Sequence, residues 1–182
     1  MDTTRNKIDA TLIFLVRGES GRQKVLLARK VRKLIINCYN GFGGSLNKRE
    51  TPRACAVREL YKESGLVALK EDLEFVGVMT FYNKREKKDG GGEFAVRVFI
   101  FILKKWRGKL KLKEDEMRDV RWFKTYRLPI KEMAPSDRFW VPLILNGEYK
   151  DKLLRGEAWH SPQQKRLLEI SIKCVGKTSD VD

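Results

Sequence analysis

Residues 41–66, GFGGSLNKRETPRACAVRELYKESGL, combine a glycine-rich loop with a helix whose start and end are both marked in the sequence. The glycines allow the loop backbone to approach a ligand closely, because they carry no side chain. Thr51 is a favourable N-cap, and Pro52 suits the first helical position. Gly65 is a favourable helix stop. The sequence therefore predicts a ligand-facing loop that leads directly into a helix over residues 52–64.

Two acidic residues, Glu59 and Glu63, lie one turn apart on this helix. Like charges at this spacing repel each other and reduce helix stability. A hard divalent cation, which prefers oxygen ligands, would explain the pair, and an ordinary solvated charged face is the alternative. We expect the two acids to lie opposite the buried apolar stripe of the helix. That stripe consists of Ala54, Val57, Leu60 and Tyr61.

Length and composition exclude several classes of protein. The 182 residues are enough for one domain with a sizeable core. The three cysteines show no C-x2-C spacing, which favours a reducing compartment over a disulfide or zinc framework. His160 is the single histidine, so histidine triads are excluded. The apolar run 10–16 is too short to cross a bilayer, and Asp9 precedes it where a signal peptide would be basic. We expect a cytoplasmic protein without a membrane partner, with the nucleus and mitochondrion left open.

The net charge of +15 attracts polyanions such as nucleic acid, although lysines that serve solubility explain it equally well. Residues 104–113 carry six basic side chains, but their K-L-K-L-K alternation is typical of a half-exposed strand. The chain shows neither an RNP motif nor a basic recognition helix. We therefore keep nucleic acid as a minor candidate partner and expect a monomer.

Apolar patterns predict strands around the helix. Residues 94–103 are apolar almost throughout, which is typical of a central strand buried on both faces. A second helix is expected from Pro135 to about Leu145, and a closing hairpin over residues 152–175. The glycine-containing segment 83–93 is expected to be a mobile loop. Further strands are expected at residues 9–16, 24–29, 73–82, 109–113 and 120–123.

The loop and helix together resemble the Nudix box, G-x5-E-x7-R-E-U-x-E-E-x-G-U, in which U is a bulky aliphatic residue. Every fixed position but one matches in register. The matching residues are Gly44, Glu50, Arg58, Glu59, Leu60, Glu63, Gly65 and Leu66. A match of this length favours the metal interpretation of the paired acids.

The resemblance implies the fold class α/β (α+β), namely a Nudix-like α/β/α sandwich with a mixed central sheet and the Nudix loop-helix. It implies one domain over residues 1–182 and a hydrolase that uses Mg²⁺, with Mn²⁺ as an alternative. The implied metal ligands are Glu59, Glu63, Glu116 and the Gly44 carbonyl, and the three glutamates are also the catalytic candidates. The implied structural residues of the box are Glu50, Arg58 and Gly65.

Two of these assignments have alternatives. Glu116 lies in an acidic turn, so it is either a ligand or base of the site or an ordinary solvated acid. Lys62 occupies the mismatched position, where the family has a glutamate that holds magnesium. The charge reversal is expected to weaken metal binding, because like charges repel. The lysine is also long enough to swing away or to meet a substrate phosphate.

Beyond the box, the runs NGFGGSLNKRET and WFKTYRLPIKEMAPSDRFWVPLIL extend the resemblance over nearly the whole chain. They are similar to MutT-type oxidised-purine nucleoside triphosphatases, which hydrolyse 8-oxo-dGTP and 2-hydroxy-dATP to the monophosphate and pyrophosphate. The resemblance implies that Asn40 contacts the purine, that Asp137 binds the base edge, and that Phe81 is a pocket aromatic. Lys30, ahead of the pocket loop, is a further substrate-binding candidate, with an ordinary surface lysine as the alternative.

The predicted base pocket departs from this subgroup. Ala134 stands where the subgroup has a stacking tryptophan, Ser136 replaces the first of two aspartates, and Asn83 replaces an aromatic residue. Base–aromatic stacking contributes about 1–3 kcal/mol, and a lone aspartate cannot share a proton with a neighbouring one. We therefore expect either a weaker preference for oxidised purines or a different base.

Three functions follow from the sequence. The first is hydrolysis of oxidised purine nucleoside triphosphates, with the nucleoside triphosphate as the main partner and sanitation of the nucleotide pool as the role. The second is hydrolysis of another nucleoside diphosphate or of a capped RNA end. The third is nucleotide or RNA binding by a Nudix fold with little catalysis, which Lys62 motivates.

Overall fold

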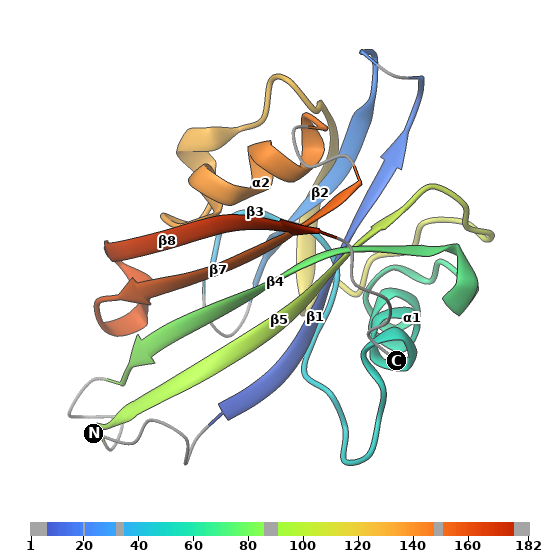
Figure 1. The fold of residues 1–182 in the computed structure, drawn as a ribbon. Helices are drawn as coiled ribbons and strands as arrows, with labels where there is room; N and C mark the ends of the chain where they lie inside the picture. Colours follow the sequence, from blue (N-terminus) through green and yellow to red (C-terminus); the bar gives the residue numbers. More distant parts are fainter. Residues whose placement is uncertain (1–6, 20, 32–34, 86–90, 148–150, 177–182) are drawn as a thin grey trace.

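The computed structural model describes residues 7–19, 21–31, 35–85, 91–147 and 151–176 (Figure 1). Two helices and three short 3-10 helices accompany the strands within these ranges. The helices are α1 (Pro52–Ser64), η2 (Lys70–Asp72), η4 (Ile130–Glu132), α2 (Asp137–Leu145) and η5 (Pro162–Gln164). The strands are β1 (Lys7–Arg17), β2 (Lys24–Lys30), β3 (Tyr39–Asn40), β4 (Leu73–Lys84), β5 (Glu93–Leu103), β6 (Met117–Lys124), β7 (Lys152–His160) and β8 (Leu167–Gly176).

The described strands form one mixed sheet in the order β3-β2-β1-β5-β4-β7-β8, and β6 pairs with β2. The pairs β1–β5 and β4–β7 are parallel, whereas the remaining pairs are antiparallel. As expected from its apolar sequence, β5 lies in the middle, between β1 and β4 (Figure 1). The fold class predicted from the sequence is confirmed.

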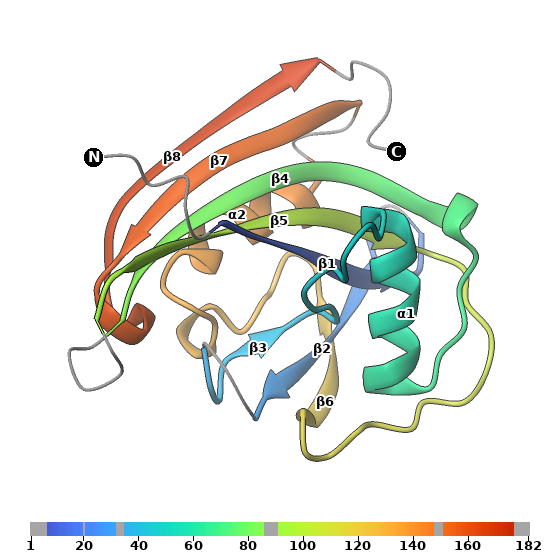
Figure 2. The same cartoon turned by 90° about the horizontal axis from the view of Figure 1, so that it is seen from below.

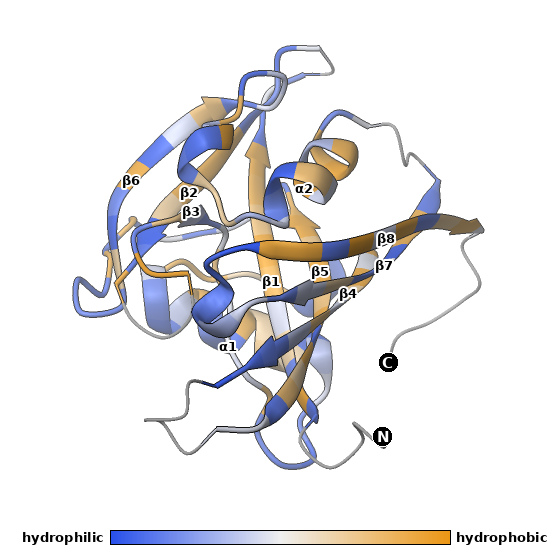
Figure 3. Cartoon of the chain, turned by 90° about the vertical axis from the view of Figure 1, so that its left-hand side faces the viewer, coloured by the Kyte–Doolittle hydropathy of each residue, from blue (hydrophilic) through white to orange (hydrophobic). Residues whose placement is uncertain are grey.

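The two helices cover opposite faces of the sheet (Figure 2). Because successive strand residues point to opposite faces, β1 contributes to both cores. Leu12 and Phe14 belong to the core under α2, whereas Ile13 and Leu15 belong to the core under α1. The central strands are correspondingly apolar along their length, as Figure 3 shows. The result is the predicted α/β/α sandwich.

The predicted helix bounds are confirmed. The Thr51 side chain accepts a hydrogen bond from the Ala54 N–H, and Gly65 ends α1 with a left-handed φ of 69°. The predicted stripe is right for Leu60, which is buried, and for Val57, which packs against the core, but it is wrong for Tyr61. Tyr61 is 61% exposed, whereas Glu59 and Glu63 are buried on the same side as Leu60. The acids are buried because the glycine loop covers them, which helical periodicity alone does not reveal.

Residues 109–113 do not form the predicted strand. Instead, the Lys111 and Lys113 amides donate to the carbonyls of Ser64 and Glu63, at 2.8 and 2.9 Å. These bonds satisfy carbonyls at the end of α1, which have no partner within the helix. The K-L-K-L-K alternation therefore reflects an extended segment that caps a helix.

The other predicted elements are found with shifted ends. The second helix and the closing hairpin are confirmed, with β7 and β8 antiparallel. Strands β4 and β5 reach further into the expected loop than predicted, and residues 86–90 of that loop lie outside the described residues. None of the described helices is long and apolar enough to span a membrane.

Candidate active site

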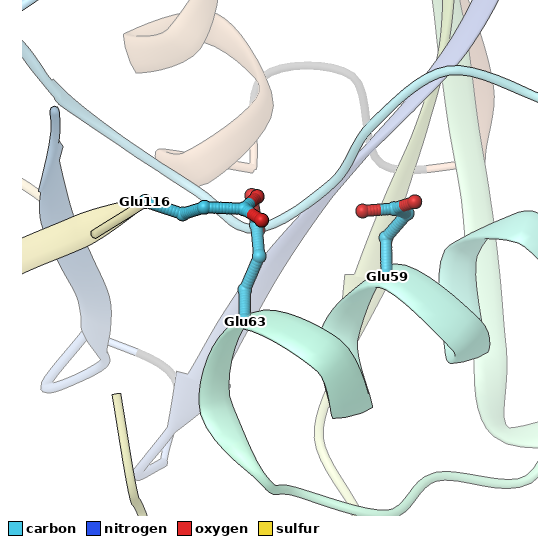
Figure 4. Close-up of side chains that lie close together, drawn as sticks. All are labelled: Glu59, Glu63 and Glu116. Atoms are coloured by element: carbon cyan, nitrogen blue, oxygen red, sulfur yellow. The ribbon is translucent and has the colours of Figure 1, made fainter. Parts of the chain in front are cut away.

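Three carboxylates converge where α1 faces the turn that precedes β6. Glu59 and Glu63 come from α1 and Glu116 from the turn, as Figure 4 shows. One carboxylate oxygen from each residue lies within 4.8 Å of the others. Glu59 and Glu63 are only 5% and 3% exposed. Carboxylate oxygens are the ligands that Mg²⁺ prefers, so this donor set fits a divalent cation.

Lys62, the residue that departs from the Nudix box, bridges two of the three acids. Its Nζ lies 3.2 Å from Glu59 Oε2 and 3.4 Å from Glu116 Oε1. Lys113 Nζ also contacts Glu116 Oε1, at 2.7 Å. The ammonium group of Lys62 therefore lies among the oxygens that would surround a metal ion, and it competes with such an ion for two carboxylates.

Glu63 is held by the glycine loop and by Lys30. The Gly43 N–H donates to Glu63 Oε2 at 2.8 Å, and Lys30 Nζ lies 3.1 Å from Glu63 Oε1. Burial raises the pKa of Glu63, while Lys30 and the Gly43 N–H lower it. Lys30 is thus a partly buried partner of the acidic cluster.

Gly44 lies directly against Glu59. A Cβ atom at this position would come within 2.7 Å of the Glu59 carboxylate, so the loop can approach the cluster only without a side chain here. The Gly44 carbonyl, the fourth predicted ligand, accepts a hydrogen bond from the Thr11 N–H at 2.9 Å. That bond fixes the loop to β1 beside the three carboxylates.

Arg58 and Glu50 connect the glycine loop to α1. Arg58 Nε and one of its terminal nitrogens each lie 2.7 Å from a Glu50 carboxylate oxygen, a bidentate pair. Arg58 also donates to the Ser45 carbonyl at 3.1 Å and contacts Glu59. Its hydrogen bonds lower the pKa of Glu50 to about 2. Through these contacts the two residues join the glycine loop to α1.

This pair predicts a loss of stability in acid. Because the pKa of Glu50 is lower in the folded chain than its ordinary 4.5, the ionised carboxylate favours folding above pH 4.5. That contribution is lost progressively as the pH falls toward 2. We expect Glu50→Gln to lower the melting temperature at pH 7 and to lower it much less at pH 3, as thermal unfolding monitored by circular dichroism would show. An equal loss at both pH values would contradict the linkage.

One cavity of about 510 Å³ extends from the acidic cluster to an apolar wall formed by β1, β4 and β5. Seven of the residues proposed for the site line it: Lys30, Asn40, Gly44, Phe81, Glu63, Glu116 and Asp137. Apolar side chains from the strands complete the wall, among them Leu12, Val96 and Val98. The cavity thus joins a charged end, suited to phosphates, to an apolar end, suited to a flat base.

At the apolar end, the buried side chain of Asp137 lines the cavity and has three polar partners. Trp140 Nε1 donates to Asp137 Oδ1 at 3.0 Å, and Asn40 Nδ2 donates to Oδ2 at 3.3 Å. The Ser136 hydroxyl lies 3.4 Å from Oδ1. Burial raises the pKa of Asp137 to about 7, although the bonds from Trp140 and Ser136 lower it. Near neutral pH this group can therefore exist with or without a proton.

Among the lining residues that were not predicted from the sequence are Trp140 and Gln164. Trp140 is fully buried between Phe14 and Phe81, with ring centroids 6.0 and 6.4 Å away. Its position three residues after Asp137 on a helix was a usable signal, because such residues share a face. Gln164 reaches the cavity from η5, and no local pattern indicates it.

Comparison with known proteins agrees with this geometry. The NUDIX domain model matches residues 6–144. Oxidized purine nucleoside triphosphate hydrolases of Mus musculus and Danio rerio are each 34% identical to the chain. The matches cover 68% and 74% of this chain, and 72% and 78% of those proteins.

A solved structure has a similar fold. The crystal structure of a MutT protein from Bacillus halodurans superimposes with a TM-score of 0.72 and 21% identity, covering 91% of this chain and 97% of that one. At this identity the likeness concerns the fold. Together with the family match and the two relatives, it shows that the chain belongs to the Nudix family and is a Nudix hydrolase.

Proposed function

We propose that the protein hydrolyses purine nucleoside triphosphates, including oxidised forms such as 8-oxo-dGTP and 2-hydroxy-dATP, to the monophosphate and pyrophosphate with Mg²⁺. The observation that carries this proposal is that one cavity joins the acidic cluster to the pocket around Asp137. A nucleotide has matching ends, an anionic chain of phosphates and a flat base. Sanitation of the nucleotide pool is the corresponding role.

At the phosphate end of the cavity, the contacts indicate what each charged side chain would do. Glu59, Glu63 and Glu116 would hold the metal ion, which when bound neutralises phosphate charge and orients the attacking water. Lys30 and Lys62 lie beside the same carboxylates and line the cavity, so they offer further positive charge to the phosphates. One of the glutamates is the candidate base.

At the base end, Asn40 and Asp137 provide the hydrogen-bonding edge and Phe81 an apolar wall. Asn40 Oδ1 accepts from the Gly41 N–H at 2.8 Å, so its amide group is held with Nδ2 toward Asp137. Ala134 is buried in place of the subgroup's tryptophan and gives no aromatic face for stacking. We infer weaker discrimination between bases than in the relatives for this reason.

We propose that residues 1–182 form one domain, although the family model ends at residue 144. Strands β7 and β8 continue the same sheet, because β7 pairs in parallel with β4. The η5 turn between them supplies Gln164 to the cavity wall. The C-terminal hairpin is thus part of the proposed site.

The raised pKa of Asp137 predicts a pH-dependent Michaelis constant. Below about pH 7 the carboxyl group is protonated and can both donate and accept at the base edge. Above it, the ionised group can only accept. We expect KM for the purine nucleotide to rise as the pH increases through about 7, and we expect Asp137→Asn, which does not titrate, to lose this step. If KM of the Asp137→Asn variant rose by the same amount over this pH range, another titrating group would be responsible for the rise.

The test of the proposed function is product analysis with Mg²⁺ on 8-oxo-dGTP, 2-hydroxy-dATP, dGTP and dATP. Release of pyrophosphate and monophosphate, with an oxidised purine preferred, is the expected result. Release of inorganic phosphate, or no hydrolysis of any of the four under conditions in which the protein is folded, would overturn it.

A second cavity favours one alternative. It has a volume of about 730 Å³ and shares Ile35 and Gln164 with the first. Its lining includes the acid Glu132, which contacts Arg29, and four basic side chains. These are Arg29, Lys131, Arg138 and Lys165. A substrate with a second anionic part, such as a capped RNA end, matches this extension. Faster product release from a short capped RNA than from the four triphosphates would favour it.

A further inference from the structure

Gln164 brings an amide side chain into the substrate cavity from a part of the chain that the family model does not include. It ends η5, the turn between β7 and β8, whereas the family model ends at residue 144. The residue lines the cavity together with Phe81, Asp137 and Trp140. The residue is 9% exposed, so its amide is removed from bulk solvent. A buried amide needs hydrogen-bond partners.

A chain of hydrogen bonds fixes the orientation of this amide. The Phe81 backbone carbonyl can only accept, and Asn83 Nδ2 donates to it at 2.9 Å. The other end of the Asn83 amide is therefore the acceptor Oδ1, to which Gln164 Nε2 donates at 2.7 Å. Asn83 is 3% exposed, so this chain is buried. The remaining end of the Gln164 amide is Oε1, which is an acceptor.

The backbone around Gln164 adopts a conformation that side chains disfavour. Gln163 and Gln164 have φ values of 56° and 54°, in the left-handed region. The turn is closed by bonds from the Gln164 N–H to the Ser161 carbonyl, at 3.0 Å, and from the Arg166 N–H to the Ser161 hydroxyl, at 2.9 Å. Strained residues of this kind gather at binding sites, where the surrounding structure holds them.

We propose that Gln164 is a specificity residue whose Oε1 accepts a hydrogen bond from the exocyclic amino group of a purine. The ligand class rests on the proposed function. Each oxygen of Asp137 already accepts one hydrogen bond, from Trp140 or from Asn40, so the Gln164 amide adds a second acceptor group to this end of the cavity. An amino-bearing purine supplies the complementary donor.

The test measures binding of nucleoside monophosphates to the full chain, with intrinsic tryptophan fluorescence as the readout because Trp140 lines the cavity. The probes are dGMP against dIMP, and dAMP against purine 2′-deoxyriboside 5′-monophosphate. Each pair differs only by one amino group. We expect the amino-bearing member of at least one pair to bind about tenfold more tightly, the effect of one hydrogen bond.

Gln164→Ala should reduce this ratio to about one. Gln164→Met should also reduce the ratio to about one, because methionine has a similar length but no amide oxygen. This variant fills the volume of the glutamine side chain and serves if Gln164→Ala is unstable. Gln163→Ala is the matched control, because Gln163 has the same backbone conformation but lines the second cavity. It should keep the wild-type ratio.

The inference is overturned if both Gln164 variants keep the wild-type ratio of affinities. It is also overturned if the wild type binds both members of each pair equally well, or if no monophosphate binds. These outcomes are separate from the fate of the proposed function, which hydrolysis of the triphosphates decides. A wild type that discriminates monophosphates through Gln164 but does not hydrolyse triphosphates would support the inference and overturn the proposed function.

Discussion

Glu63→Gln is expected to remove hydrolysis while leaving the fold intact. The substitution replaces an oxygen of a proposed metal ligand and a negative charge of the acidic cluster, so we expect kcat to fall by at least about a hundredfold, within the several kcal/mol that metal-ion catalysis contributes. The glutamine carbonyl can still accept from the Gly43 N–H. Because burial raises the pKa of Glu63, the neutral amide also avoids the desolvation cost of a charged group.

Pyrophosphate release and thermal unfolding, measured on the same preparation, check this expectation. Glu114→Gln is the matched control, because it removes the same charge from an exposed position two residues before Glu116. It should retain nearly full activity. If Glu63→Gln kept most of the activity, the acidic cluster would not be the catalytic centre. If the wild type were itself inactive on every nucleotide offered, a binding role would replace the enzymatic proposal for these substrates.

Lys62→Glu is expected to tighten binding of a divalent cation by about ten- to a hundredfold, the range seen when groups around metal ligands are changed. The wild-type ammonium lies 3.2 and 3.4 Å from Glu59 and Glu116 and holds two of the carboxylates that would bind the ion. The substitution removes this competitor and adds a carboxylate. Titration of the protein with Mn²⁺, followed by electron paramagnetic resonance of the free ion, measures the change directly.

Lys62→Gln separates the two effects of that substitution, because it removes the ammonium without adding a ligand. We expect its Mn²⁺ affinity to lie between those of the wild type and Lys62→Glu. Equal affinities in all three proteins would show that Lys62 moves away from the carboxylates when the ion binds. An accompanying rise in activity would show that the lysine limits the wild-type reaction through its metal site.

The sequence determined the local structure of the loop and of α1, because their signals lie within a few residues of one another. Thr51 caps the helix, Gly65 ends it, and Arg58 connects it to Glu50, all from neighbouring positions. The Nudix box likewise placed Glu59 and Glu63 one turn apart. Family and fold class followed from the same segment, since a pattern of this length is specific.

Helical periodicity failed where burial depends on distant parts of the chain. Glu59 and Glu63 are buried because the glycine loop folds over them, and Tyr61 is exposed although it has the spacing of a core residue. The alternation at residues 109–113 resembled a strand because an extended segment that caps a helix has the same local conformation. A hydrophobic pattern shows which side chains are apolar, but it does not show which other element of the fold covers them.

Only the tertiary structure decided which residues meet in the cavity. Lys62 lies between Glu59 and Glu116, an arrangement that depends on how the turn before β6 packs against α1. Asn83 and Gln164 are far apart in the sequence, and the parallel pairing of β4 with β7 brings their amides to 2.7 Å. Such contacts depend on strand order and register, which many distant interactions set together and no short segment encodes by itself.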